Sequence, residues 1–304
     1  MTQTLEVLSH RTASMQSIRS IVHTMKTLSV INSAPYEHAA RAIEAYHDTV
    51  LDGLHAFLSQ IGPYEGSSSA VTTKVLIVFG SDHGLCGNYN EALAGHVAEQ
   101  LADAFGQTTV LCIGAQMADA LRDQDIVPET IFFPPASVDG IGRLANLLTR
   151  HLDDMQRNQS SGEMAVSLAY FTRHGDKGQR PEVMALLPLS QNLVQELQVK
   201  PWVSRSLPSF SMPPPELFQA LIRGHLFASL FRASAEALVT ENAARLALMQ
   251  QAEQSVDERL EDLTSETRSV RQSEITTELL DVIIGFEALK KKSKPHDSAE
   301  SRNA

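Results

Sequence analysis

The sequence has little cysteine and no surplus of positive charge, and each shortage excludes a class of protein. Only two cysteines, Cys86 and Cys112, occur in 304 residues, too few for a disulfide-rich secreted domain. One disulfide and two thiols are both compatible with this count, and we expect reduced thiols in a cytosol-like compartment. Acidic residues outnumber basic ones by 36 to 25, for a net charge of -11. This charge argues against a nucleic-acid-binding protein, because acidic side chains repel phosphate.

Long hydrophobic runs are also missing. Residues 1–10 contain no apolar run and no basic leader, so we expect no signal or transit peptide. The longest apolar stretches are as short as residues 75–79, far below the length of a membrane span. We therefore expect no direct insertion into a membrane, and any membrane association to run through a partner protein.

Glycine and proline are nearly absent from the first sixty residues, which hold only Gly53 and Pro35. Apolar or small residues recur there at gaps of three and four, which predicts an amphipathic helix over residues 1–60. A proline inside a helix removes a hydrogen bond, so we expect a kink or short break at residues 33–36. The five histidines of this segment do not form a tight ligand pair, and solvated helix-face positions are favoured for them. They are His10, His23, His38, His47 and His55.

A second long segment near the C-terminus has the same character. Residues 216–292 contain no proline and two glycines, Gly224 and Gly285. As one helix, about 75 residues would span on the order of 110 Å. Apolar residues keep the spacing of three and four as far as Leu289, which predicts a coiled-coil helix over residues 216–290. We expect residues 291–304 to be a polar, disordered tail.

The middle of the chain alternates between strand-like and helix-like segments. Apolar, β-branched runs at 74–79, 108–113, 130–133, 163–172 and 182–187 predict strands, with helices between the earlier ones. This order predicts a Rossmann-like α/β domain over residues 70–190 with a largely parallel sheet. Residues 191–215 are rich in proline, and we expect an irregular connector. The predicted fold is a long antiparallel coiled coil of the two terminal helices with the α/β domain inserted as a foot.

Residues 80–90 form a glycine-rich turn between the first strand and the next helix, and they are the best candidate for chemistry. Backbone amides of such a turn can hold a phosphate, but there is no GxGxxG or Gly-Lys-Ser motif, and Asp82 would repel an anion. Ser81, Asp82 and His83 are triad residue types, yet adjacent residues rarely converge into a catalytic line. A structural turn is favoured over nucleotide binding or hydrolysis, and no cofactor or metal site is predicted.

Three segments resemble the gamma subunit of F-type ATP synthases. RQSEITTELLDVIIGFEAL at residues 271–289 is similar to the family's Arg-Gln-x-x-Ile-Thr-x-Glu signature. ENAARLALM at residues 241–249 resembles its Ser-Glu-x-x-Ala-Arg-Met-x-Ala-Met block. SDHGLCGNYN at residues 81–90 is close to its Ser-Asp-Arg-Gly-Leu-Cys-Gly-x-x-Asn turn. The N-terminal helix and the segments at 170–171 and 186–189 fit the same family, so the resemblance spans nearly the whole chain in the right order.

Several positions depart from the family pattern. The usual Lys-Ile-Thr reads Lys26-Thr27-Leu28, and Pro35 falls where the helix normally continues. His83 replaces the arginine of the turn, and Leu246 replaces a methionine. These departures suggest a divergent branch, such as the second, alternative F-type ATPase of some bacteria.

The resemblance implies a role without a catalytic site or cofactor. It implies a central rotor shaft that couples ion-driven rotation of the membrane c-ring to ATP synthesis or hydrolysis. Its partners would be three alpha and three beta subunits, the epsilon subunit and the c-ring, at the cytoplasmic face of the bacterial inner membrane. Contacts with the surrounding subunits are implied for Arg271, Gln272, Thr276, Glu278, Glu241, Arg245 and Lys26. The structural turn of the foot would consist of Ser81, Asp82, Gly84, Gly87 and Asn90.

Two other classes of function stay open on the residues alone. A coiled-coil scaffold with an α/β insert, unrelated to rotary catalysis, predicts a stable homodimer. A small α/β enzyme that uses residues 81–83 predicts turnover by the purified chain. Neither accounts for the ordered motifs at both ends and in the middle.

Overall fold

The computed structural model describes residues 4–61, 71–102, 108–158, 163–174, 178–202, 205–206 and 209–292. The chain divides into two compact units. The first comprises Met1–Met25 and Gln250–Ala304, and the second comprises Lys26–Met249. Helix α1 (Leu5–Ile61) and helix α6 (Pro214–Lys292) each contribute to both units. None of the described helices is long and apolar enough to cross a membrane.

The first unit is an antiparallel pair of helices. The Arg19 Nε atom lies 2.7 Å from Asp257 Oδ1, and His23 Nδ1 lies 3.2 Å from Glu253 Oε1. Residue numbers therefore increase along one helix where they decrease along the other, which makes the pair antiparallel. Leu8 and Leu263 are buried in this unit. The antiparallel coiled coil predicted from the spacing of apolar residues is present here.

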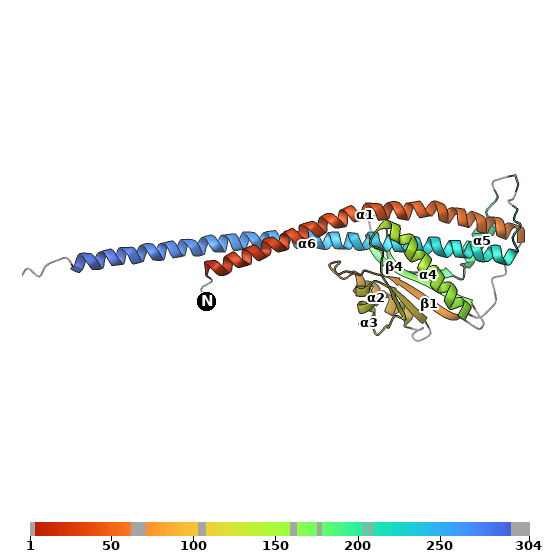
Figure 1. The fold of residues 1–304 in the computed structure, drawn as a ribbon, viewed down its shortest axis with the longest axis horizontal. Coiled ribbons are helices and arrows are strands. Elements are labelled where there is room, and N and C mark those ends of the chain that lie inside the picture. The colour runs from red at the N-terminus through yellow and green to blue at the C-terminus, as the bar shows by residue number, and fades with distance from the viewer. Residues whose placement is uncertain are drawn as a thin grey trace, which may run out of the picture. The chain divides into compact units, whose positions relative to one another are not determined.

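The pairing of the first unit ends before α6 does. Extending the register of the two ion pairs places Leu5, the first residue of α1, level with Arg271. Beyond that point α6 runs past the N-terminal end of α1, as the blue end of the helix shows in Figure 1. The pairing expected as far as Leu289 is therefore wrong over residues 271–289, because the described part of α1 has no residue left to lie opposite them.

The second unit contains the rest of both helices, again antiparallel. The rings of Phe57 and Phe218 stack with centroids 5.5 Å apart, and Tyr46 meets Phe227 edge-on. Helix α1 passes through Pro35 without interruption, so of the kink or short break expected at residues 33–36 the break is wrong. Tyr36, next to the proline, is buried in an apolar cluster with Val239 of α6, and this packing offsets the lost hydrogen bond.

The α/β domain has one five-stranded sheet with the order β3-β2-β1-β4-β5. Its strands are β1 (Val71–Phe79), β2 (Thr108–Ile113), β3 (Thr130–Phe132), β4 (Glu163–Arg173) and β5 (Gln179–Leu187). All pairings are parallel except that of β4 with β5. The predicted α/β class with a largely parallel sheet is confirmed.

Helices cover both faces of this sheet (Figure 1). Alternate residues of β1 point to opposite faces: Leu76 packs in the cluster of α2 (Tyr89–Leu101) and α3 (Ala115–Arg122). Ile77 packs in the other cluster, which includes α4 (Val138–Asn158) and Leu226 and Leu230 of α6. Helix α6 is thus part of the core of the α/β domain.

Two features of the second unit differ from the sequence-based expectation. The connector predicted as irregular contains α5 (Gln191–Val199), which is capped by the Ser190 hydroxyl and packs its Val194 and Leu197 in a cluster with Leu54. The expectation of solvated histidines is wrong for His55, which is buried beside Trp202. Residues 62–70 and most of the predicted tail, 293–304, lie outside the described residues.

Candidate functional site

The turn at residues 80–90 is held by a closed set of hydrogen bonds. The Ser81 backbone N–H donates to Asn90 Oδ1 at 3.0 Å, and Asn90 Nδ2 donates to Ser81 Oγ at 2.8 Å. The Ser81 hydroxyl in turn donates to the carbonyl oxygen of His83 at 2.9 Å. Ser81 and Asn90 are both buried. The network leaves the buried polar atoms of this turn satisfied and fixes its shape.

Asp82 and the neighbouring glycines join the turn to the next βα connection. Asp82 Oδ1 accepts a hydrogen bond from the backbone N–H of Ala115, at the start of α3. Gly114 has φ 104°, and a Cβ atom there would lie 2.4 Å from the Ser81 carbonyl oxygen, so only glycine fits. Gly87 also has a positive φ of 67°, whereas a Cβ atom at Gly84 would meet nothing.

The geometry of the turn does not form a catalytic line. The Ser81 hydroxyl bonds the backbone of His83 rather than its ring. The His83 side chain is 86% exposed, and its Nε2 lies 4.0 Å from Asp82 Oδ2. Burial raises the pKa of the Cys86 thiol, which disfavours the reactive thiolate. The hydrolase alternative therefore gains no support.

An ion pair on α6 lies against the same turn. Arg245 Nη2 donates to Glu241 Oε1 at 2.5 Å, and the two side chains are only 9% and 10% exposed. The same Nη2 atom lies 3.5 Å from the His83 carbonyl oxygen, while Arg245 Nε is buried without a hydrogen-bond partner. Burial raises the pKa of Glu241, and the charge of Arg245 opposes that rise. Both charges are thus directed into the chain's own interior.

Two further polar contacts join the α/β domain to α6. The Tyr89 hydroxyl, fully inside the domain, donates to the Ala237 carbonyl oxygen at 3.1 Å and lies 3.0 Å from Thr240 Oγ1. At the end of β4, Arg173 makes a two-pronged contact with Glu236: Nε to Oε1 at 2.7 Å and Nη2 to Oε2 at 3.0 Å. Arg173 Nη1 also reaches Glu37 of α1 at 3.2 Å.

The other residues implied as partner contacts lie elsewhere on the helices. Arg271, Gln272, Thr276 and Glu278 are all exposed, on the part of α6 beyond the pairing with α1. The Thr276 hydroxyl donates to the Gln272 carbonyl oxygen of its own helix at 2.8 Å. Lys26 is half-buried on α1. Arg271, Gln272, Thr276 and Glu278 belong to the first unit, whereas Lys26 and the Glu241–Arg245 pair belong to the second.

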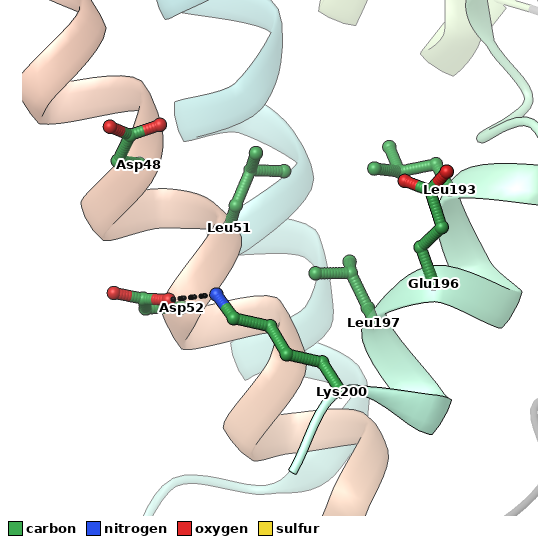
Figure 2. Close-up of a pocket in the computed structure, with 7 residues that line it drawn as sticks. All are labelled: Asp48, Leu51, Asp52, Leu193, Glu196, Leu197 and Lys200. Atoms are coloured by element: carbon green, nitrogen blue, oxygen red, sulfur yellow. Dashed lines mark hydrogen bonds and ion pairs between the residues drawn. The ribbon is translucent and has the colours of Figure 1, made fainter. Parts of the chain in front are cut away.

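A groove of about 460 Å³ lies between α1 and α5 in the second unit. Asp48 and Asp52 come from α1, and Glu196 and Lys200 belong to α5 and the residue after it. Figure 2 shows Lys200 reaching across to Asp52, with Nζ 3.3 Å from Oδ1. The remaining lining residues are Leu51, Leu193 and Leu197. Within the described residues, no group of three potential ligands could hold a metal ion.

Sequence reasoning missed Tyr89, Arg173 and Glu236. Their contacts join residues 63 to 151 positions apart, and nothing in the local pattern marks them. The one sequence signal for these contacts was the resemblance at residues 241–249. It pointed to Glu241 and Arg245 but not to the residues that they contact.

Comparisons with known proteins agree over almost the entire chain. The family model for ATP synthase matches residues 4–289. The ATP synthase gamma chain of Sinorhizobium medicae is 22% identical, over 94% of this chain and 99% of its own length. That of Ruminococcus albus is 24% identical, over 88% of this chain and 93% of its own.

Solved structures show the same fold. A chain of the Euglena gracilis mitochondrial ATP synthase matches with a TM-score of 0.61 at 14% identity, over 98% of this chain and 99% of that one. A chain of the Tetrahymena thermophila central stalk and c-ring structure matches with a TM-score of 0.54 at 16% identity, over 76% and 99%. With a family model that covers all but the first few residues and the tail, this chain belongs to the ATP synthase gamma chain family.

Proposed function

We propose that this chain is the central rotor shaft of an F-type ATP synthase and couples c-ring rotation to ATP synthesis or hydrolysis on alpha and beta subunits. Membership of the gamma chain family carries the proposal. The structure adds a second reason, which is a helix end that the described part of the chain leaves exposed.

That helix end is apolar on more than one side. Eight large apolar residues between 275 and 289 are 50% to 70% exposed: Ile275, Leu279, Leu280, Val282, Ile283, Ile284, Phe286 and Leu289. At 3.6 residues per turn, these positions spread over more than half of the circumference of the helix. A single partner helix would cover one stripe, whereas a helix apolar on most sides is normally surrounded. A sleeve formed by a ring of subunits fits this surface.

Polar contacts with the ring are proposed for the exposed residues of the same segment. Arg271, Gln272, Thr276 and Glu278 stand at its beginning, where they would meet loops of the beta subunits. Exposed polar pairs contribute roughly 0–1 kcal/mol each, so they can form and break as the shaft turns. Lys26 is proposed as a further contact from α1. For Glu241 and Arg245, burial and mutual pairing favour a role inside this chain over the partner contact that the resemblance implies.

Coupling requires that the shaft bind different conformations of beta differently. An asymmetric helix pair presents a different face to each of three beta subunits at any angle. Its contacts therefore favour the open state of one subunit and the closed state of another, and rotation exchanges these preferences. The chain needs no catalytic site or cofactor of its own for this role.

The α/β domain is proposed to meet the epsilon subunit and the c-ring, as a peripheral assembly on the cytoplasmic face of a bacterial inner membrane. The Tetrahymena structure with a matching chain combines the central stalk with a c-ring, which supports this arrangement. The departures at Lys26-Thr27-Leu28, Pro35 and His83 support a divergent or alternative bacterial F-type ATPase.

Affinity purification of the tagged chain from its host, with native mass measurement, tests the assignment. We expect one copy with three alpha and three beta subunits. A stable homodimer without those subunits would support the scaffold alternative and overturn the rotor assignment. Turnover by the purified chain that is lost in a His83→Ala variant would instead support the enzyme alternative.

A further inference from the structure

The α/β domain is attached to α6 by two kinds of contact. The first is apolar: Leu226, Leu230, Ala233 and Ala237 of α6 belong to the core cluster that contains one face of the sheet. Hydrophobic burial is non-directional and depends on the area removed from water. This contact holds α6 to the domain, but it opposes a small rotation or slide of the helix only through the shapes of the side chains.

Many of the side chains that α6 buries between residues 233 and 244 are small. Residues 233, 235, 237 and 244 of α6 are alanines, and all four pack in apolar clusters. Alanine allows a close approach of helix and sheet but offers little side chain to interlock. These alanines therefore set distance better than they set angle, and the larger Leu238 and Val239 of the same stretch belong to the cluster that includes Tyr36 of α1 and Ile141 of α4.

The second kind of contact is polar and directional, and it falls on the same turns of α6. Tyr89 bonds Ala237 and lies against Thr240, and Arg245 with its partner Glu241 contacts the turn at the His83 carbonyl. Hydrogen bonds weaken steeply when their angle changes. Rotation of α6 against the domain would separate the Tyr89 hydroxyl from its partners and leave buried polar atoms unsatisfied.

We propose that Tyr89, Glu241 and Arg245 form an angular joint that fixes the rotational register between the α/β domain and α6. In a rotor, torque received by the domain would reach α6 through this joint without slip. The three side chains are positioning residues, and the inference rests on the proposed function for its consequence in coupling.

The energetics of a buried ion pair fit this role. Desolvation consumes much of the attraction between two buried charges, so such a pair is a poor source of stability, and specifying one arrangement is its better-attested use. The pair here is 9% and 10% exposed, and the turn that it contacts is itself fixed by the Ser81–Asn90 hydrogen bonds. A rigid turn on one side and a charged pair on the other restrict the angle, next to the Arg173–Glu236 contact at the end of β4.

The test uses the complete complex, immobilised through its alpha and beta subunits, with a probe on the α/β domain. Gln124 is exposed and both native cysteines are buried, so a Gln124→Cys change gives this chain a single accessible cysteine for labelling. The test variant combines Tyr89→Phe, Glu241→Gln and Arg245→Met, which removes both charges together. We expect a wider angular distribution of the probe in the stalled rotor and fewer ions pumped per ATP hydrolysed.

Matched controls separate this effect from general weakening. Tyr46→Phe removes a hydroxyl from another tyrosine of the second unit, and Asp119→Asn with Arg122→Met removes an exposed ion pair of α3. Both controls should keep the parent distribution. If the triple variant fails to assemble, Tyr89→Phe alone removes one hydroxyl and should still widen the distribution.

An assembled variant with the parent angular width and the parent pumping ratio would overturn the joint and leave the rotor assignment standing. Absence of alpha and beta subunits from the purified parent chain would instead overturn the rotor assignment itself. A lower melting temperature with unchanged width would reduce the three residues to a purely structural role and would also overturn the joint.

Discussion

Two segments of the same helix, α6, differ in how far their side chains are buried. Residues 226–245 bury leucines and alanines in the α/β domain and satisfy most of their polar groups within the chain. Residues 271–289 are exposed throughout, including their large apolar side chains. Stability of the isolated chain should therefore depend on the first segment, and assembly and coupling on the second.

The largest expected effect comes from breaking the buried pair on one side only. Arg245→Met leaves Glu241 buried without its cation, which should cost about 3–5 kcal/mol of unfolding free energy. Because burial already raises the pKa of Glu241, protonation would relieve the loss, so it should shrink as the pH is lowered. Urea unfolding of the isolated chain at several pH values measures this, with Arg271→Met as the exposed control.

A matched pair of leucines on α6 gives the next effect. Leu230 is fully buried, and Leu230→Ala should cost about 2–5 kcal/mol through lost burial and a cavity. Leu279 is 57% exposed, and Leu279→Ala should change stability by less than about 0.5 kcal/mol. Equal losses in urea unfolding of the two variants would show that the end of α6 is covered within the chain.

Acid should weaken the second unit through a histidine pair that joins its two helices. His47 Nε2 lies 3.1 Å from His225 Nδ1, and burial, aided by His47, lowers the pKa of His225 to about 4. The folded pKa lies below the unfolded one, so this stability is present above about pH 6.5 and lost as pH falls toward 4. The loss should reach about 3 kcal/mol at most.

Urea unfolding from pH 7.5 to 4 checks the histidine prediction. Burial is the largest cause of the lowered pKa of His47. Of the charged groups that act on His47, Arg232 lowers this pKa further and Asp48 raises it. A His225→Gln variant should show a flatter pH dependence. The same steep slope in that variant would assign the acid sensitivity to other groups.

The smallest effect on stability should accompany a clear effect on function. Arg271→Ala with Gln272→Ala changes two exposed residues, so the unfolding free energy should stay within about 0.5 kcal/mol. Coupled ATP synthesis in membranes should fall, because the proposed contacts with beta are lost. Unchanged synthesis with normal assembly would count against these residues as ring contacts.

Much of the fold could be predicted because its signals are local. The spacing of apolar residues predicted both long helices, and the β-branched runs predicted the strands of a largely parallel sheet. The prediction failed where tertiary packing decides. Pro35 sits within a helix because its neighbour Tyr36 is buried, and α5 forms in a segment whose prolines suggested irregular structure.

The candidate site was only half predictable for the same reason. The turn at 80–90 was visible from its glycines, and Gly87 adopts a backbone angle that other residues avoid. The contacts of that turn with α6, from Tyr89 to Ala237 and from His83 to Arg245, join residues 148 and 162 positions apart, and no local pattern encodes such separations. The unpaired end of α6 was hidden because its apolar spacing continues the coiled-coil rhythm where α1 has already ended.

Direct observation of rotation tests the central claim most sharply. In the complex immobilised through alpha and beta, with a probe on Gln124→Cys, we predict ATP-driven rotation of the probe in one direction. Sustained ATP hydrolysis by that complex with a stationary, firmly attached probe would contradict the proposed role of the chain as a rotating shaft.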